Sequence, residues 1–141
     1  MPQQQIQDIM TKQVHTVRSD ATLLDVARLM RDKRIGDLLV TNRDGSVRGI
    51  VTDRDIVVRA DAAAKALDKT QVGEICTDKL VKLTPTSSID EAVKVMREHA
   101  IRRIPVVRDG QPVGIVTIGD LARHMDPNSA LAQISSAAPN N

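Results

Sequence analysis

The sequence predicts a mixed α/β fold built from two copies of a β-α-β-β-α unit, and three observations lead to this prediction. The stretches Gly49–Asp55 and Gly114–Asp120 share a pattern of glycine, two β-branched apolar residues, threonine and a later aspartate. Two apolar stripes with helical spacing, Leu23–Met30 and Ile89–Met96, begin 66 residues apart (89 − 23 = 66). In each half, a turn containing Asp-Gly separates two runs of β-branched residues, which is typical of a hairpin. One unit of roughly 55 residues would be marginal alone, so the two copies are expected to share a core across a pseudo-twofold axis.

The first half starts with a disordered segment over Met1–Gln5 and then follows the unit in order. Thr22 is expected to cap the first long helix, because apolar residues follow it at helical spacing. Asp44-Gly45 is expected to close the hairpin. The expected elements are a helical turn at Ile6–Met10, a strand at Val14–Val17, the helix from Thr22, strands at Leu38–Thr41 and Val47–Thr52, and a helix at Asp53–Arg59.

The second half repeats this plan after a connecting segment rich in alanine, lysine and aspartate. Its expected elements are an opening turn at Val72–Cys76, a strand at Leu80–Leu83, a helix capped by Ser88, strands at Ile104–Val107 and Val113–Thr117, and a helix at Ile118–Met125 that Pro127 ends. A flexible tail with some helical character at Leu131–Ile134 is expected to follow. The predicted boundaries are 6–62 for the first repeat, 63–71 for the linker, 72–127 for the second repeat and 128–141 for the tail.

The composition is that of a globular protein rather than a membrane or disulfide-rich one. Of the 141 residues, 41% are hydrophobic and 27% are charged, and no run approaches the roughly 18 apolar residues that a membrane helix needs. The N-terminus lacks a secretory signal pattern, so a cytoplasmic location with no membrane contact is expected. The single Cys76 cannot form an intramolecular disulfide, and no histidine lies at zinc-ligand spacing from it. We therefore expect Cys76 to be a small buried hydrophobic residue, and we expect no metal site.

Charge and aromatic content argue against nucleic-acid binding. The net charge is only +2, and acidic residues interrupt the basic ones throughout the chain. There is no Phe, Tyr or Trp, whereas modules that bind single-stranded nucleic acid depend on aromatic stacking. Any bound base must therefore be held by aliphatic side chains and backbone groups. An enzyme also has little support, because no nucleophile, base and orienting group occur in a recognisable arrangement.

Two threonine–aspartate pairs are the candidate site residues. Thr52 with Asp55, and Thr117 with Asp120, each lie where a strand is expected to end and a helix to begin. Backbone N–H groups at a helix start attract anions, and a carboxylate accepts hydrogen bonds from two neighbouring sugar hydroxyls, so each pair fits part of a nucleotide site. The same spacing fits a helix capping box, which needs no ligand. Because the pair recurs at matched positions in both units, we favour a ligand site and keep capping alone as the alternative.

The chain resembles a tandem pair of CBS (cystathionine β-synthase type) domains, also called a Bateman module. The resemblance covers about Ile6–Arg59 and Val72–Asp126, and it rests on the two Gly-Ile-Val-Thr motifs with their aspartates and on the segment Ala100–Val107. In its stand-alone form the chain is similar to small bacterial CBS-pair proteins of the hypoxic-response type. The resemblance implies a non-enzymatic regulatory module that requires no cofactor and binds AMP, ADP, ATP or S-adenosylmethionine in clefts between repeats. It also implies a flat homodimer that signals to a partner protein.

The resemblance further implies site residues in each repeat. The aspartate after each Gly-Ile-Val-Thr motif holds the ribose, which carries to Asp55 and Asp120, and the threonine that contacts ribose or phosphate carries to Thr52 and Thr117. Backbone from the first strand and from the segment before the second strand frames the base. These framing residues are Thr16, Val17, Arg18, Ile35, Gly36, Asp37 and Leu38 in the first repeat, and Lys82, Leu83, Thr84, Ile101, Arg102, Arg103, Ile104 and Pro105 in the second.

The two copies differ in charge beside the candidate site. The second repeat has Arg102 and Arg103 where the first has Gly36 and Asp37. An arginine near the site favours a phosphate and an aspartate opposes it, so the second copy is expected to prefer charged nucleotides. Neighbours on an extended segment point opposite ways, so one of the two arginines is expected to be a solvated surface residue.

The first copy is expected to tolerate less phosphate or to stay empty. Its aspartate opposes a phosphate, although Arg54 partly offsets that charge. This weakness supports an alternative function for the whole chain, namely a protein-interaction and dimerisation scaffold whose ligand sites are degenerate.

Overall fold

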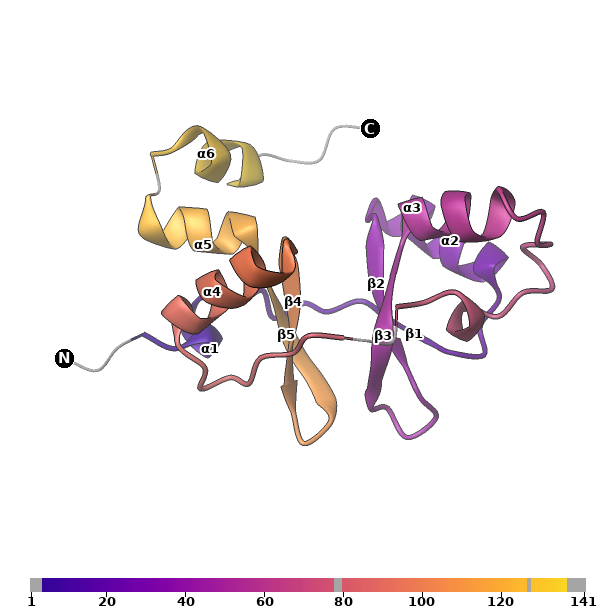
Figure 1. Cartoon of the computed structure of the whole chain (residues 1–141), viewed down its shortest axis with the longest axis horizontal. Coiled ribbons are helices and arrows are strands. Elements are labelled where there is room, and N and C mark those ends of the chain that lie inside the picture. The colour runs from indigo at the N-terminus through magenta and orange to yellow at the C-terminus, as the bar shows by residue number, and fades with distance from the viewer. Residues whose placement is uncertain (1–3, 78–79, 127, 137–141) are drawn as a thin grey trace. The chain divides into compact units, whose positions relative to one another are not determined.

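The computed structural model describes residues 4–77, 80–126 and 128–136, and the chain divides into two compact units (Figure 1). One unit, here called the C-unit, combines the N-terminal residues up to Val14 with those from Val81 onward. The other, here called the N-unit, runs from His15 to Leu80. Both units pack helices on a small sheet, so the predicted mixed α/β class is confirmed. The start of the first sequence repeat therefore lies in the unit that the second repeat builds.

The N-unit is built on a three-stranded sheet in the order β1-β2-β3. Strand β1 (Thr16–Arg18) is parallel to β2 (Asp37–Thr41), and β2 is antiparallel to β3 (Val47–Thr52). The β2–β3 hairpin turns at Gly45, whose φ of 84° is in the left-handed region that favours glycine. The predicted hairpin is thus confirmed, and the predicted strand at Val14–Val17 is shifted to β1.

Helices α2 (Leu23–Lys33) and α3 (Asp53–Asp55) lie on the same side of this sheet in Figure 1. Thr22 caps α2 as predicted, because its Oγ1 accepts a hydrogen bond of 3.1 Å from the backbone N–H of Asp25. Helix α3 continues into η1 (Ile56–Asp61). This segment is π-helical, whereas an α-helix was predicted here. The 3₁₀ turn η2 (Val72–Glu74) follows later in the chain. The core of the unit consists of the buried stripe of α2, inward-facing residues of the strands and the first residue of η2, chiefly Leu23, Val26, Leu38, Val40, Val51 and Val72.

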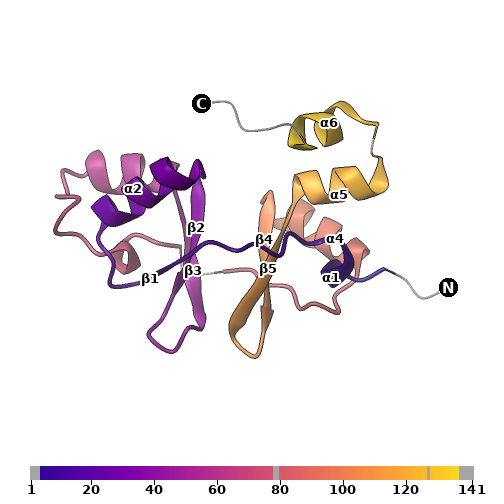
Figure 2. The same cartoon turned by 180° about the vertical axis from the view of Figure 1, so that it is seen from behind.

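The C-unit is built on the antiparallel hairpin of β4 (Arg103–Arg108) and β5 (Gln111–Thr117). Helices α4 (Ile89–His99) and α5 (Ile118–Met125) pack on the hairpin, and Figure 2 shows helix α1 (Ile6–Ile9) in the same unit. Ile6 anchors α1, because its side chain is fully buried and its N–H donates to the carbonyl of Ser87 at 2.8 Å. The N-terminal helix therefore completes the core of the second repeat.

The predicted strand at Leu80–Leu83 is wrong. Only Leu83 pairs, as a single parallel bridge with Val106. In the N-unit, the N–H of Ser19 extends the corresponding ladder by donating to β2 at 2.9 Å. The matching position in the second repeat (19 + 66 = 85) is Pro85, which has no N–H to donate. The ladder therefore ends before a strand can form.

The segment predicted as a flexible tail contains helix α6 (Ala130–Ser136), which packs on α5. The helical character expected at Leu131–Ile134 is thus confirmed. Ala132 is only 1% exposed, and its N–H donates to the hydroxyl of Ser129 at 3.1 Å. Pro127, expected to end α5, lies outside the described residues, as do residues 1–3 and 137–141 of the two expected tails.

The motif glycines let a neighbouring segment approach the last strand of each unit. Thr77 forms an antiparallel bridge with Ile50, with hydrogen bonds of 3.0 and 3.2 Å. A Cβ atom on Gly49 would lie 2.1 Å from the carbonyl oxygen of Thr77, which no real Cβ tolerates. The same arrangement recurs in the C-unit, where Thr11 bridges Ile115. Packing therefore requires the glycine at position 49, whereas a Cβ atom on Gly114 would first meet the flexible side chain of Met10, with the carbonyl oxygen of Thr11 at 3.0 Å.

Candidate functional site

Both threonine–aspartate pairs form complete capping boxes. The hydroxyl of Thr52 accepts from the N–H of Asp55 at 3.1 Å, and Asp55 Oδ2 accepts from the N–H of Thr52 at 2.9 Å. Thr117 and Asp120 make the same two bonds at 3.1 and 2.9 Å. The backbone angles also agree, with φ and ψ of −117° and 163° at Thr52 and −115° and 163° at Thr117. The capping interpretation is thus confirmed, and each unit holds one carboxylate in the same place at the end of its last strand.

Asp120 has further partners inside the C-unit. Its residue is only 3% exposed, and each carboxylate oxygen lies 3.2 Å from the hydroxyl of Thr11. Oδ1 also forms an ion pair with the guanidinium of Arg123, one helical turn further along α5. Thr11 follows α1 in sequence. The N-terminal segment, which belongs to the C-unit although it precedes the first repeat's sheet, therefore directly contacts the candidate site.

Asp55 has a more open environment in the N-unit. Its side chain is 18% exposed, and its second oxygen lies 3.7 Å from the guanidinium of Arg59, too far for a hydrogen bond. Arg59 instead donates to the carbonyl of Ile75 at 3.0 Å. Thr77 occupies the position that matches Thr11 (11 + 66 = 77), yet no hydrogen bond joins it to Asp55 within the described residues. The twin carboxylates therefore share one capping geometry and differ in every other contact.

The structure separates the two arginines of the second repeat. Arg103 lies opposite Thr117 in the β4–β5 register, so the two side chains share a face of the hairpin. Arg102 instead lines a groove between helices. Asp37 lies opposite Thr52 in the N-unit, at the position that Arg103 takes in the C-unit. The predicted charge difference is therefore placed directly beside the two threonines.

The guanidinium of Arg103 is partly desolvated, although the residue as a whole is exposed. This desolvation lowers the pKa of Arg103, because loss of hydration disfavours the charged form. The group remains a cation at neutral pH, because the ordinary pKa of arginine lies far above neutrality.

The residues expected to frame the base of a ligand lie in both units, and each unit holds those of its own repeat. Four of them, Leu38, Leu83, Ile104 and Pro105, have buried side chains, so only their backbone groups are available to a ligand. The N-unit holds Thr16, Val17, Arg18, Ile35, Gly36, Asp37, Leu38 and the exposed Arg54, and the C-unit holds Lys82, Leu83, Thr84, Ile101, Arg102, Arg103, Ile104 and Pro105.

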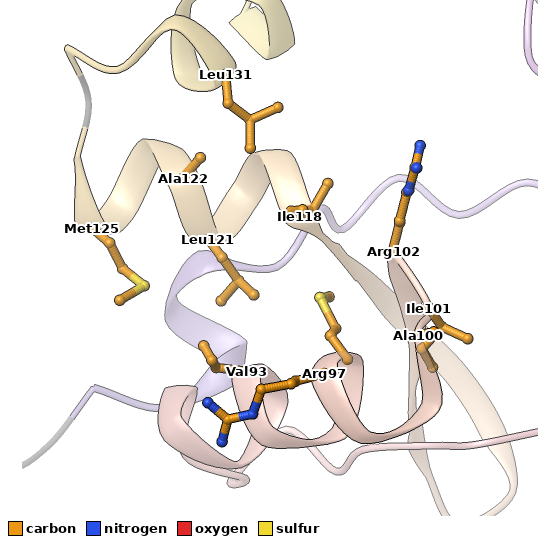
Figure 3. Close-up of a pocket in the computed structure, with 11 residues that line it drawn as sticks. Val93, Arg97, Ala100, Ile101, Arg102, Ile118, Leu121, Ala122, Met125 and Leu131 are labelled. Carbon is orange, nitrogen blue, oxygen red and sulfur yellow. The ribbon is translucent and has the colours of Figure 1, made fainter.

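A groove between α4, α5 and α6 was not predicted from the sequence. It encloses about 570 Å³, and apart from two arginines its lining is apolar. Figure 3 shows Leu121 and Met125 directed from α5 toward α4, and Leu131 directed from α6 toward α5. The lining residues are Val93, Met96, Arg97, Ala100, Ile101, Arg102, Ile118, Leu121, Ala122, Met125 and Leu131. One feature of the sequence could have indicated this groove. The apolar residues of α5 continue at helical spacing to Met125, which lies beyond the buried core.

Cys76 packs in the N-unit core at 8% exposure, as predicted. Within residues 4–77, 80–126 and 128–136, no three His, Cys, Asp or Glu side chains gather as a metal site requires. In the same part of the chain, no helix has the length and apolarity to cross a membrane.

Comparison with known proteins places these features in context. A family model described as the CBS domain matches the chain twice, over residues 6–61 and 72–127. Hypoxic response protein 1 of Mycobacterium tuberculosis is 38% identical over 130 residues, which cover 92% of this chain and 90% of that protein. The CBS domain-containing protein YhcV of Bacillus subtilis is 38% identical over 134 residues, which cover 92% of this chain and 94% of that protein.

Solved structures of CBS-domain proteins are also similar to this chain. The crystal structure of Hypoxic Response Protein I with two coordinated zinc ions matches with a TM-score of 0.81 at 38% identity, covering 86% of this chain and 99% of that chain. The structure of the hexameric CBS-CP12 protein from bloom-forming cyanobacteria matches with a TM-score of 0.74 at 31% identity, covering 88% of this chain and 72% of that chain. The similarity thus extends to sequence and to fold over most of the chain.

Proposed function

The chain belongs to the CBS-domain family, and from that premise we propose that it is a non-enzymatic regulatory module that binds an adenosine-containing ligand and signals to a partner protein. The family match covers both repeats, and paired CBS domains are commonly regulatory and ligand-binding. The ligands that fit the proposal are AMP, ADP, ATP and S-adenosylmethionine. Their ribose hydroxyls would bond to Asp55 or Asp120, and backbone groups would frame the base.

The observation that carries the proposal is that both Gly-Ile-Val-Thr motifs end in the same reciprocal capping box, at matched positions of the two units. Reciprocal boxes also begin α1 and η2, but glutamine caps those two helices and neither box belongs to a Gly-Ile-Val-Thr motif. Thr22 with Asp25 and Ser88 with Glu91 have the same spacing, yet only the hydroxyl caps the helix there. At the two Gly-Ile-Val-Thr motifs the carboxylate is also fixed, by a bond to the N–H of the threonine. A carboxylate held in one orientation at a strand end is the acceptor that a sugar diol needs.

The charges beside the two boxes support different ligand preferences. The cation of Arg103 beside Thr117 favours a phosphate in the C-unit. The anion of Asp37 beside Thr52 disfavours one in the N-unit. We therefore propose that nucleotides with more phosphate prefer the C-unit, and that the N-unit accepts ligands with less negative charge.

A thermal-unfolding experiment tests the proposal. With no tryptophan or tyrosine present, unfolding is followed with an extrinsic dye or by calorimetry. A ligand at 100 times its dissociation constant should stabilise the protein by about 2.7 kcal/mol, a shift of several degrees in the melting temperature. The panel is AMP, ADP, ATP and S-adenosylmethionine, and CMP is the matched control because it retains ribose and phosphate but lacks adenine. Absence of any adenylate shift at millimolar concentration would favour the scaffold with degenerate sites.

The groove supports a second role, self-association. Three large apolar residues that line it are exposed, Ile118 at 42%, Met125 at 65% and Leu131 at 40%. An exposed apolar patch of this kind commonly marks a protein interface. The hexameric CBS-CP12 relative shows that a chain of this family can assemble. We propose that a second copy of this chain covers the groove, which makes the protein a homodimer.

Replacing Met125 with aspartate tests this role. The side chain is largely exposed, so the variant should fold, while the new charge should prevent burial of the groove against a second copy. Sedimentation velocity should show a dimer for the natural protein and a monomer for Met125→Asp. The matched control is Val57→Asp, which adds the same charge at a large exposed apolar residue that does not line the groove. A natural protein that sediments as a monomer, or a variant that stays dimeric, would rule out this face.

A further inference from the structure

Thr11 holds an unusual position for a residue of an N-terminal segment. Its backbone pairs with Ile115 of β5 through hydrogen bonds of 2.8 and 2.9 Å, so the residue is fixed at the strand that leads to the site. Its hydroxyl then lies 3.2 Å from both oxygens of Asp120. Thr11 therefore presents to Asp120 the same donor group, an alcohol O–H, that a ribose would present.

The Asp120 carboxylate has too little acceptor capacity left for both hydroxyls of a ribose. An ionised carboxylate offers about four lone-pair directions. The N–H of Thr117 takes one on Oδ2, the guanidinium of Arg123 takes one on Oδ1, and the Thr11 hydroxyl lies between the two oxygens. At 3% exposure the residue also has almost no contact with solvent. Two ribose hydroxyls can bond to it only after a present partner leaves.

The matching carboxylate of the N-unit is not occupied in this way. Asp55 accepts one backbone hydrogen bond, from Thr52, and among the described residues its other oxygen has only the 3.7 Å ion pair with Arg59. Thr77 makes the same backbone bridge as Thr11, yet it donates no hydrogen bond to Asp55 in the described part of the chain. The repeat therefore supplies an internal comparison, one carboxylate with the threonine hydroxyl and one without it.

We infer that Thr11 controls ligand access to Asp120, because its hydroxyl occupies the carboxylate that the ribose of an adenosine ligand would need. The inference rests on the proposed function and adds its regulation. Of the three partners, Thr11 is the one that a ligand can replace most readily. Its bond is long and shared between two oxygens, while the N–H of Thr117 is fixed by the capping box and Arg123 is held by charge. When a ligand binds in the C-unit, a ribose hydroxyl thus replaces the hydroxyl of Thr11 on Asp120. The affinity is lowered by the free energy of the Thr11–Asp120 hydrogen bond that must break.

Thr11→Val tests the inference, because valine keeps the shape and the backbone bridge and removes the hydroxyl. In an Asp55→Asn background, which isolates the Asp120 site, titration calorimetry with AMP should show about fivefold tighter binding for Thr11→Val. Thr77→Val is the matched control at the equivalent bridge and should leave AMP affinity unchanged. Thr11→Ser, which keeps the hydroxyl, should behave like the natural residue.

A merely structural role for Thr11 predicts equal or weaker binding, so tighter binding identifies control of access. Equal affinity of Thr11→Val and its parent for AMP would overturn the inference while leaving the proposed function intact. Should Thr11→Val unfold, Thr11→Ala provides a second chain without the hydroxyl, and the same fivefold gain is expected. If none of AMP, ADP, ATP and S-adenosylmethionine binds the natural protein or any variant at millimolar concentration, the proposed function fails, and control by Thr11 fails with it.

Discussion

Replacing Gly49 with alanine should lower the free energy of unfolding by about 3 kcal/mol, the sum of overpacking and of weakened hydrogen bonds in the Ile50–Thr77 bridge. The new methyl carbon would lie 2.1 Å from the carbonyl oxygen of Thr77 and 2.9 Å from its carbonyl carbon. Both are backbone atoms, so no side-chain rotation relieves the contact, and the bridge must separate. Urea unfolding should therefore show a lower midpoint, and the melting temperature should fall by roughly 10 °C.

The control for this prediction is Gly36→Ala in the same unit. Its new carbon would meet only the side chain of Asp53, at 3.3 Å, and that carboxylate can move by a few tenths of an ångström. The loss should stay below about 1 kcal/mol. Similar losses in the two variants would show that Thr77 does not approach β3 as closely as the structure places it.

Local patterns were sufficient to predict most helices and both hairpins. The stripe from Leu23 to Met30 repeats every three to four residues, and α2 buries that face. Asp109 and Gly110 adopt φ of 53° and 80°, as the Asp-Gly turn requires. Such features depend on residues close together in sequence, which is why they can be read directly from it.

Features that depend on distant pairing could not be predicted in the same way. Nothing near Ile6 indicates that α1 completes the core of the second repeat, because its partner Ser87 lies 81 residues away (87 − 6 = 81). The missing strand at Leu80–Leu83 has a local cause that was overlooked, the absent N–H of Pro85. Elements whose boundaries depend on a partner strand are therefore the least predictable.

The candidate site shows the same division. Thr117 and Asp120 form a local motif, and both were predicted. Arg123 follows Asp120 by three positions on one helix, a spacing at which side chains meet, so it could have been recognised. Thr11 is 109 residues from Asp120, and only the repeat, which aligns it with Thr77, offered a hint. Ligand access therefore depends on contacts that a local motif does not contain.

Asp120→Ala should destabilise the protein much more than Asp55→Ala, by about 3 kcal/mol against about 1 kcal/mol. Removing the Asp120 side chain leaves the Thr11 hydroxyl, the Thr117 N–H and the Arg123 guanidinium without their acceptor in a buried place. The guanidinium is 37% exposed and regains some hydration, which keeps the expected loss below that of a fully buried ion pair.

Removing the Asp55 side chain frees only the N–H of Thr52 and the half-exposed Arg59, so the expected loss is that of one helix cap. Urea unfolding of the two variants without ligand measures the difference. Asp120→Asn and Asp55→Asn are the controls, because the amide keeps the size and one acceptor oxygen of each carboxylate. Equal losses from the two alanine variants would mean that the contacts of Thr11 and Arg123 with Asp120 contribute nothing to stability. Because Asp120→Ala is expected to lose more stability, weaker adenylate binding by this variant could come from a disturbed fold. It can be assigned to a lost ribose contact only after the fold is shown to persist. Asp55→Ala is expected to lose little stability, so it tests the ribose contact directly.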